Sequence, residues 1–327
     1  MNIRDRRAME ETAAGAFRRA DAPQKIILVY ALVCCGLSLL STVLAVLLGD
    51  KIAGTGGLGN IGLRSVLSTG QSVLPLITTI VTACLNFGYH TAVLSITRGY
   101  DASPATLSLG FRRFGVIFRT MLLQGLVYFS ASLMVIYLSS TLFVATSLGA
   151  EFTALMEPYL SSMTVLDTGF ILTEEMMAPL MQAMVPMFYI MGALGLLFLT
   201  PLCYRFRMVN YALADDPDKG AIHAILKSRH LMRRNCIALF RLDLKLWWYY
   251  AAQILITLIC YGDVLLPMAG VSFPWNATVS YYLFYVLSLA AQFALYYFTM
   301  NRVYGIYAVA YDALQEQATE NTNIVQM

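Results

Sequence analysis

The sequence predicts an all-α protein, a polytopic membrane helix bundle with about six transmembrane helices and two interfacial amphipathic elbow helices. Three observations predict this fold class. Apolar side chains make up 58% of the 327 residues and charged ones only 13%, whereas about a quarter of the residues of a soluble domain are charged. The mean hydropathy is +0.65. Several uncharged stretches are long enough to cross a hydrocarbon layer about 30 Å thick at about 1.5 Å per helical residue.

The first three predicted spans follow from three uncharged runs. The first run holds 24 uncharged residues before Asp50 and predicts a span over 26–48. In the second run Pro75 favours a kink or a late helix start, so we expect the spanning part at 72–96. The third run has 31 uncharged residues and predicts a span over 120–146.

The other three predicted spans are 180–204, 246–268 and 279–301. A run of 29 uncharged residues predicts the first of them. The next has only 17 uncharged residues before Asp263, which is short but suits a helix whose acid reaches the water interface. A cluster of Pro, Gly and Asn between residues 267 and 276 predicts a turn, after which the last span begins.

The positive charges give the orientation, because Lys and Arg near span ends stay on the cytoplasmic side. Segments 1–25, 98–119, 205–245 and 302–327 hold 20 of the 22 basic residues. We therefore expect a six-span domain over 26–301 in the cytoplasmic (plasma) membrane, with a cytoplasmic N-terminal segment, a cytoplasmic tail and both termini inside the cell.

The two large inner loops, 98–119 and 205–245, are the predicted elbows. Each contains Asp or Ser followed by Pro, which is typical of a helix start. The second loop predicts an interfacial amphipathic helix whose basic side chains point away from an apolar face. That apolar face comprises Ala221, Ile222, Ala224, Ile225, Leu231 and Met232.

Anionic headgroups attract such a basic surface by about 1 kcal/mol per charge. The lipid bilayer, through its anionic headgroups, is therefore an expected partner of the elbows. The residues expected to contact headgroups are Arg112, Arg113, Arg233 and Arg234.

Asp243 is a candidate for a link between the elbows. It ends a basic stretch and precedes the aromatic run at 247–250. It could pair with Arg241, with Lys245 or with an arginine of the first elbow and so lock the two elbows together. Alternatively, it is an acid at headgroup level beside an aromatic belt.

Three polar residues inside predicted spans are candidates for an intramembrane role. Asn86 and His90 are four residues apart and share one face of a helix. They could line a polar path, or they could form the interhelical hydrogen bonds, worth about 1 kcal/mol, that hold helix bundles together. Asp263 could carry a proton or an ion, or it could simply reach the outer water.

The sequence lacks the motifs of familiar enzymes and nucleotide-binding proteins. It has three histidines and no HExxH, Cys-x-x-Cys, phosphate-loop or GxSxG pattern. We therefore predict no catalytic, cofactor-binding or metal-binding residue, no cofactor and no nucleic-acid partner. The six cysteines lie mostly in apolar segments and are expected to be free.

The stretch from Pro201 to Trp248 resembles the signature region of the domain of unknown function 975 family, a group of bacterial integral membrane proteins. The segments around residues 88–114 and 304–314 look like this family too, so that the resemblance covers about residues 85–315. The matching residues are Tyr204, Tyr211, Asp215, Asp216, Pro217, Ser228, Leu231, Met232, Leu239, Phe240, Leu242, Asp243, Leu244, Trp247 or Trp248, Tyr311 and Asp312.

The chain departs from the family pattern at two places. Arg234 and Cys236 flank Asn235 where the family tends to have Gly and Lys, and Lys245 and Leu246 replace small residues. The resemblance implies a membrane-embedded helical fold and a bacterial source, and it implies no substrate.

Two classes of function remain open. The first is a non-enzymatic membrane protein that acts by association with a membrane partner, with a second copy of itself or with anionic lipid. The alternative is a small-solute transporter or permease-like component. A transporter should gather Asn86, His90 and other polar side chains in a continuous cavity, whereas an association module should have a dry, packed interior.

Overall fold

The computed structural model describes residues 6–20, 23–54, 61–162, 174–268 and 277–325, and the described residues are helical without strands. The longer helices are α1 (Arg6–Arg19), α2 (Pro23–Gly54), α3 (Ile61–Thr97), α5 (Phe114–Val144), α6 (Ser147–Ser162), α7 (Glu174–Phe206), α9 (Gly220–Met232), α10 (Cys236–Lys245), α11 (Trp247–Cys260), α13 (Ala277–Leu295) and α14 (Asn301–Val325). Short elements complete the chain: η2 (Pro104–Ser108), α4 (Leu109–Arg112), α8 (Val209–Asp215), η3 (Pro217–Lys219), α12 (Gly262–Met268) and the π-helix η4 (Tyr296–Met300).

The predicted fold class is confirmed. Five helical segments of the described chain are long and apolar enough to cross a bilayer, and they coincide with five of the six predicted spans. The chain is therefore a multi-pass membrane protein. These segments are Pro23–Gly49, Ser68–Thr97, Phe114–Val144, Met184–Asp215 and Val279–Thr319.

The remaining predicted span, 246–268, is not one continuous helix. The helix breaks at Tyr261 into α11, with 14 residues, and the short α12. Alone, α11 would measure roughly 21 Å, less than the hydrocarbon core. The break occurs where Gly262 packs against Phe284 of α13, since a Cβ at Gly262 would lie 2.7 Å from that ring. The turn predicted around residues 270–276 lies outside the described residues.

The chain forms two compact units. The first comprises residues 1–120 and 208–327, and the second comprises residues 121–207. In the second unit, α5 and α7 meet where the rings of Tyr128 and Phe206 lie 5.8 Å apart. The ring of Phe143 near the end of α5 contacts Phe152 of α6 at 5.8 Å.

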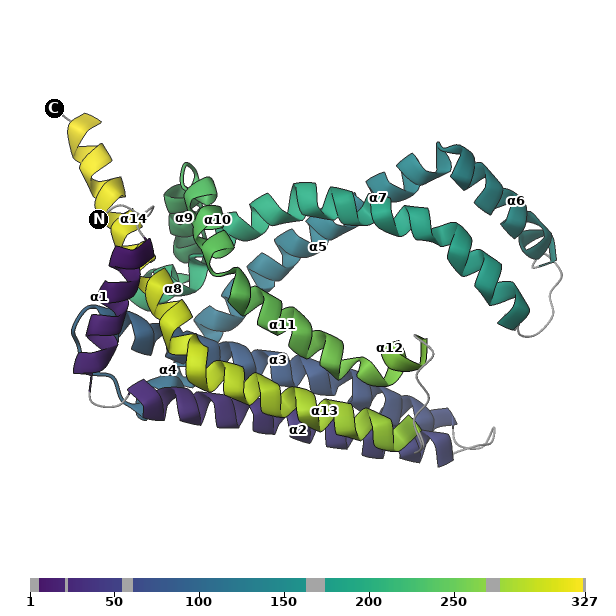
Figure 1. The fold of residues 1–327 in the computed structure, drawn as a ribbon, viewed down its shortest axis with the longest axis horizontal. Helices are drawn as coiled ribbons and strands as arrows, with labels where there is room; N and C mark the ends of the chain where they lie inside the picture. Colours follow the sequence, from purple (N-terminus) through teal and green to yellow (C-terminus); the bar gives the residue numbers. More distant parts are fainter. Residues whose placement is uncertain (1–5, 21–22, 55–60, 163–173, 269–276, 326–327) are drawn as a thin grey trace. The chain divides into compact units, whose positions relative to one another are not determined.

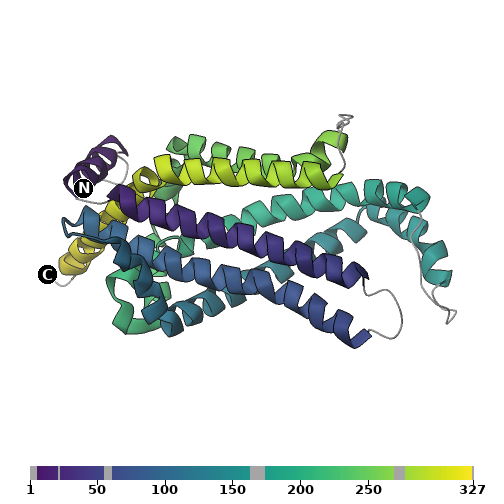
Figure 2. The ribbon, with the colours of Figure 1, turned by 90° about the horizontal axis from the view of Figure 1, so that it is seen from below.

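In the first unit, α2, α3 and α13 run side by side, with α11 against α13 (Figures 1 and 2). The central element is α3, which contacts α1, α2, η2, α4, α8 and α14. Glycines permit the closest of these approaches. A Cβ at Gly88 would lie 2.5 Å from the carbonyl oxygen of Leu107 in η2, and a Cβ at Gly110 would clash with the backbone of Cys84. The first elbow is thus packed directly on α3.

The second elbow folds as α8, η3, α9 and α10. η3 begins at Pro217, as the Asp-Pro pair predicts, although the Asp216 side chain makes no capping hydrogen bond, and Gly220 begins α9 with a φ of +82°. Most of the predicted apolar face of α9 is buried, including Ala221, Ala224, Leu231 and Met232, but Ile222 is exposed on the opposite side, contrary to expectation.

The two terminal segments, predicted as a cytoplasmic segment and a cytoplasmic tail, are helices packed on the first unit. η4 links α13 to α14, which buries Ile306, Tyr307, Tyr311 and Leu314 at helical spacing. α1 lies against α14. The fit depends on Gly305, because a Cβ there would lie 2.6 Å from the ring of Phe17.

Candidate functional site

A cluster of charged and polar side chains joins four helices of the first unit, and Arg98 is its centre. Arg98 follows the last residue of α3, so its side chain is available for contacts beyond the helix. Its Nη1 donates to Oδ1 of Asp215 at 2.7 Å, and its Nη2 donates to Oδ1 of Asp312 at 2.7 Å. We call this set of side chains the Arg98 cluster; it comprises Arg98, Asp215, Lys227, Tyr311, Asp312 and Gln315.

The second oxygen of Asp215 is fully engaged. It accepts hydrogen bonds from Lys227 Nζ at 2.6 Å, from Gln315 Nε2 at 2.9 Å and from the Tyr311 hydroxyl at 3.1 Å. The Lys227 ammonium also lies over the Tyr311 ring, 5.6 Å from its centre. Asp215 on α8 thereby connects the end of α3, the middle of α9 and α14.

The Arg98 cluster is partly shielded from solvent, since the side chains of Arg98, Asp215 and Asp312 are 31%, 15% and 30% exposed. Partial burial disfavours the Arg98 cation, but the hydrogen bonds and charges of Asp312 and Asp215 outweigh that effect and raise the pKa of the guanidinium above its usual range. Arg98 therefore stays charged at physiological pH and holds Asp215 and Asp312 together.

Asn86 and His90, predicted as either a polar path or interhelical hydrogen bonds, are engaged inside the bundle. The Tyr30 hydroxyl of α2 donates to Oδ1 of Asn86. Nδ1 of His90 lies 2.6 Å from the carbonyl oxygen of Asn86, and the His90 ring is buried edge-on against Tyr211 and Tyr304 at 4.8 and 5.2 Å.

Further tyrosines extend this packed interior. The Tyr89 hydroxyl donates to Oδ1 of Asn301 at 2.8 Å, and the Tyr211 hydroxyl donates to the carbonyl oxygen of Tyr304 at 2.9 Å. Tyr89 is fully buried. Polar side chains at these positions therefore bond and pack against one another across the helices, which is how helix bundles use such side chains.

Asp243 is buried and faces the C-terminal helix. The Tyr307 hydroxyl of α14 donates to Oδ1 of Asp243, and the Tyr250 hydroxyl of α11 lies 2.7 Å from that of Tyr307. Asp243 thus ties α10 to α14, an element that the predicted elbow lock did not include. The pairing of Asp243 with Arg241, whose side chain is exposed, stays a prediction.

The two elbows do meet, through residues other than Asp243. Arg113 of the first elbow forms an ion pair with Asp218 in η3 of the second. Of the four arginines predicted to contact headgroups, Arg113 is therefore already paired with a carboxylate. Arg112, Arg233 and Arg234 have exposed side chains.

Asp263 occupies the first turn of α12, immediately after the helix break at Tyr261. An acid is favourable there because free amide groups and the helix dipole attract negative charge. Its place at a helix start is thus favourable for a carboxylate, and a role of Asp263 with an ion or a proton stays a prediction.

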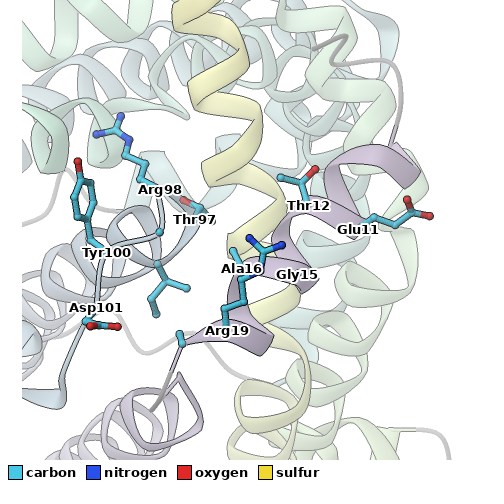
Figure 3. A pocket seen from close by; sticks show the side chains of 12 residues that line it. Glu11, Thr12, Gly15, Ala16, Arg19, Thr97, Arg98, Tyr100 and Asp101 are labelled. Carbon is cyan, nitrogen blue, oxygen red and sulfur yellow. The ribbon is translucent and has the colours of Figure 1, made fainter.

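A pocket of about 570 Å³ opens between α1 and the turn after α3. Figure 3 shows Thr97, Arg98, Tyr100 and Asp101 on one side of it and residues of α1, including Arg19, on the other. Glu11 and Asp101 balance the charges of Arg19 and Arg98, and the Arg98 guanidinium is already held by Asp215 and Asp312. The lining therefore favours no particular class of ligand.

Within the described part of the chain, no group of three or more His, Cys, Asp or Glu side chains could hold a metal ion. The six cysteines are free; Cys34 and Cys84 are buried, and Cys203 is exposed.

Sequence reasoning did not predict the Arg98 cluster as a site, and the one expectation that groups its residues is the predicted family resemblance. The three stretches that resemble the domain of unknown function 975 family include Arg98, Asp215 and the pair Tyr311–Asp312. These stretches meet in space at the cluster. Gln315 and Lys227 could not have been paired with them from spacing alone.

Comparisons of the chain with protein-family models, with curated proteins and with solved structures found no match. The resemblance to the domain of unknown function 975 family stays a prediction.

Proposed function

We propose that this chain is a non-enzymatic membrane protein that acts by association, binding a membrane partner, a second copy of itself or anionic lipid. The observation that carries the proposal is the packing of Asn86 and His90 against tyrosines inside the first unit. Asn86 and His90, the side chains best placed to line a solute path, are instead engaged by Tyr30, Tyr211 and Tyr304. A path for a polar solute would need such groups facing open space.

The proposal places the chain in a bacterial cytoplasmic membrane with both termini in the cytoplasm. The concentration of Lys and Arg in four segments supports this orientation. The packing of α1 on α14 supports it as well, because it brings the two terminal helices to the same end of the first unit (Figure 1). The resemblance to the domain of unknown function 975 family supports the bacterial source.

Native mass spectrometry of the full chain, released from membranes by a mild detergent, tests the proposal. We expect a species that retains an anionic phospholipid, a second copy or another membrane protein at fixed stoichiometry. Proteoliposomes that contain the same preparation should release trapped ions and small solutes no faster than protein-free vesicles. A bare monomer by mass spectrometry, or solute release that depends on the protein, would contradict the proposal and favour the transporter hypothesis.

A further inference from the structure

The outward face of α10 carries a row of apolar side chains. Ile237, Phe240 and Leu244 are 69%, 44% and 56% exposed. Their spacing of three and four residues places them in one row along the helix. An exposed apolar row of this kind on a water-facing surface would be unfavourable, so it marks an interaction surface.

The other side of α10 holds the helix to the rest of the first unit. Leu239, Leu242 and Asp243 are buried there, and Asp243 is fixed by the Tyr307 hydroxyl. α10 is therefore held to its own protein by these buried side chains, while Ile237 and Leu244 keep more than half of their surface exposed. α10 is thus anchored by one side and carries exposed apolar side chains on the other.

Positive charge borders this apolar row. Arg233 and Arg234 lie in the turn that precedes α10, and Arg241 lies within the helix, adjacent to Phe240. All three arginine side chains are exposed. Apolar side chains next to arginines are typical of helices that lie in the headgroup region of an anionic membrane.

The position of α10 in the chain is consistent with that depth in the membrane. It leads through Leu246 into α11, an apolar helix, and Trp247 at the start of α11 is 67% exposed. Tryptophan is enriched at the boundary between the headgroups and the hydrocarbon core. In Figure 1, α10 runs across the direction of α2, α3 and α13 at the end of the first unit where α11 begins.

We infer that the outward face of α10, with Arg233, Arg234 and Arg241, is a docking surface for anionic phospholipid headgroups. The apolar row inserts between acyl chains, and the arginines bind the phosphates above it. The inference rests on the proposed function and deepens it by naming anionic lipid as a partner and α10 as the place where it binds.

Quenching of tryptophan fluorescence by brominated lipids tests the inference directly. The chain has three tryptophans, so a Trp275→Phe background leaves Trp247 and Trp248 as the reporters beside α10. The protein is reconstituted with brominated phosphatidylglycerol or with brominated phosphatidylcholine at low salt. We expect both lipids to quench the reporters and phosphatidylglycerol to quench at a lower mole fraction.

The variant R233Q/R234Q/R241Q should remove most of that preference, because each cation near an anionic surface contributes up to about fivefold in binding. A matched control, R7Q/R18Q/R19Q, removes the same number of exposed arginines from α1 and should retain the preference. Quenching by phosphatidylcholine should be unchanged in both variants, which shows that the reporters keep their position.

Three results would overturn the inference. The first is that neither lipid quenches the reporters, and the second is that the two lipids quench equally in the Trp275→Phe protein. The third is that R233Q/R234Q/R241Q keeps the full preference for phosphatidylglycerol. Each of these leaves a protein partner or a second copy, detected by native mass spectrometry, as the associated molecule. Solute release from proteoliposomes would instead contradict the proposed function, whatever the lipid preference of α10. A failure of the lipid inference and a failure of the proposed function therefore appear in different assays.

Discussion

Replacing Arg98 by Gln should destabilise the first unit more than the loss of any exposed arginine does. Arg98 bonds Asp215 and Asp312, which lie 117 and 214 residues away in the chain. The substitution removes both ion pairs. It leaves Asp215 with Lys227 and Gln315, whereas Asp312 loses the guanidinium that neutralises it.

The size of the effect follows from the partial burial of these groups. Fully exposed ion pairs contribute about 0–1 kcal/mol, and breaking a buried pair costs about 3–5 kcal/mol. The side chains of Arg98, Asp215 and Asp312 are between 15% and 31% exposed. We therefore expect Arg98→Gln to lower the free energy of unfolding by an intermediate amount, about 2–3 kcal/mol. For a domain of this size that corresponds to a fall in Tm of roughly 4–12 °C.

Thermal unfolding in detergent, followed by intrinsic fluorescence, measures the change. The matched control is Arg112→Gln, which removes an exposed arginine of the first elbow and should shift the Tm by less than about 2 °C. A cycle with Asp312→Asn isolates one pair, and the double variant should lose about 1 kcal/mol less than the sum of the single variants. The reasoning is refuted if Arg98→Gln behaves like Arg112→Gln, or if the cycle is additive.

Three further predictions test other contacts of the first unit by the same unfolding assay. Gly88→Ala should lower the free energy of unfolding by about 1–3 kcal/mol, because its Cβ would meet the first elbow. The control Gly36→Ala has open space around the Cβ and should leave the free energy of unfolding unchanged or raise it. Equal effects of the two variants would disprove the close approach at Gly88. Tyr307→Phe removes the hydroxyl that donates to buried Asp243 and should lower the free energy of unfolding by about 1–3 kcal/mol. An unchanged Tm would show that this hydrogen bond contributes little to stability. Gly305→Leu should displace α1 from α14, so limited proteolysis should cleave α1 sooner than in the parent protein, and equal cleavage rates would contradict the packing.

The membrane-spanning helices could be predicted from the sequence because the bilayer imposes a simple constraint. Charged side chains are costly in hydrocarbon, so uncharged runs such as those before Asp50 and after Arg119 mark helices directly. The second elbow was predictable for a similarly local reason, since Asp216 and Pro217 favour a helix start wherever they occur.

The contacts that define the candidate site could not be predicted in this way. Arg98 and Asp312 are far apart in the chain, and a single sequence does not specify which distant helices pack together. The break at Tyr261 lies beside the close contact between Gly262 and Phe284, which also becomes visible only in three dimensions.

The C-terminal helix shows where a local signal was overlooked. The residues from Val303 to Leu314 repeat apolar side chains at helical spacing, and they are buried in the structure. The prediction of a tail over 302–327 uses the polar end of this stretch and does not use this periodicity. Tyr307 and Tyr311, which contact Asp243 and Asp215, lie on the buried part.

Access of water to the interior of the first unit is the most direct test of the account. The measurement is the rate at which a membrane-impermeant thiol reagent modifies Asn86→Cys in lipid nanodiscs, read by peptide mass spectrometry, with Arg112→Cys as the exposed reference and both variants fully modified after denaturation. An interior closed by side-chain packing predicts a rate at Asn86→Cys that is a small fraction of the rate at Arg112→Cys. Comparable rates at the two positions would reveal a water-filled path and contradict a function by association.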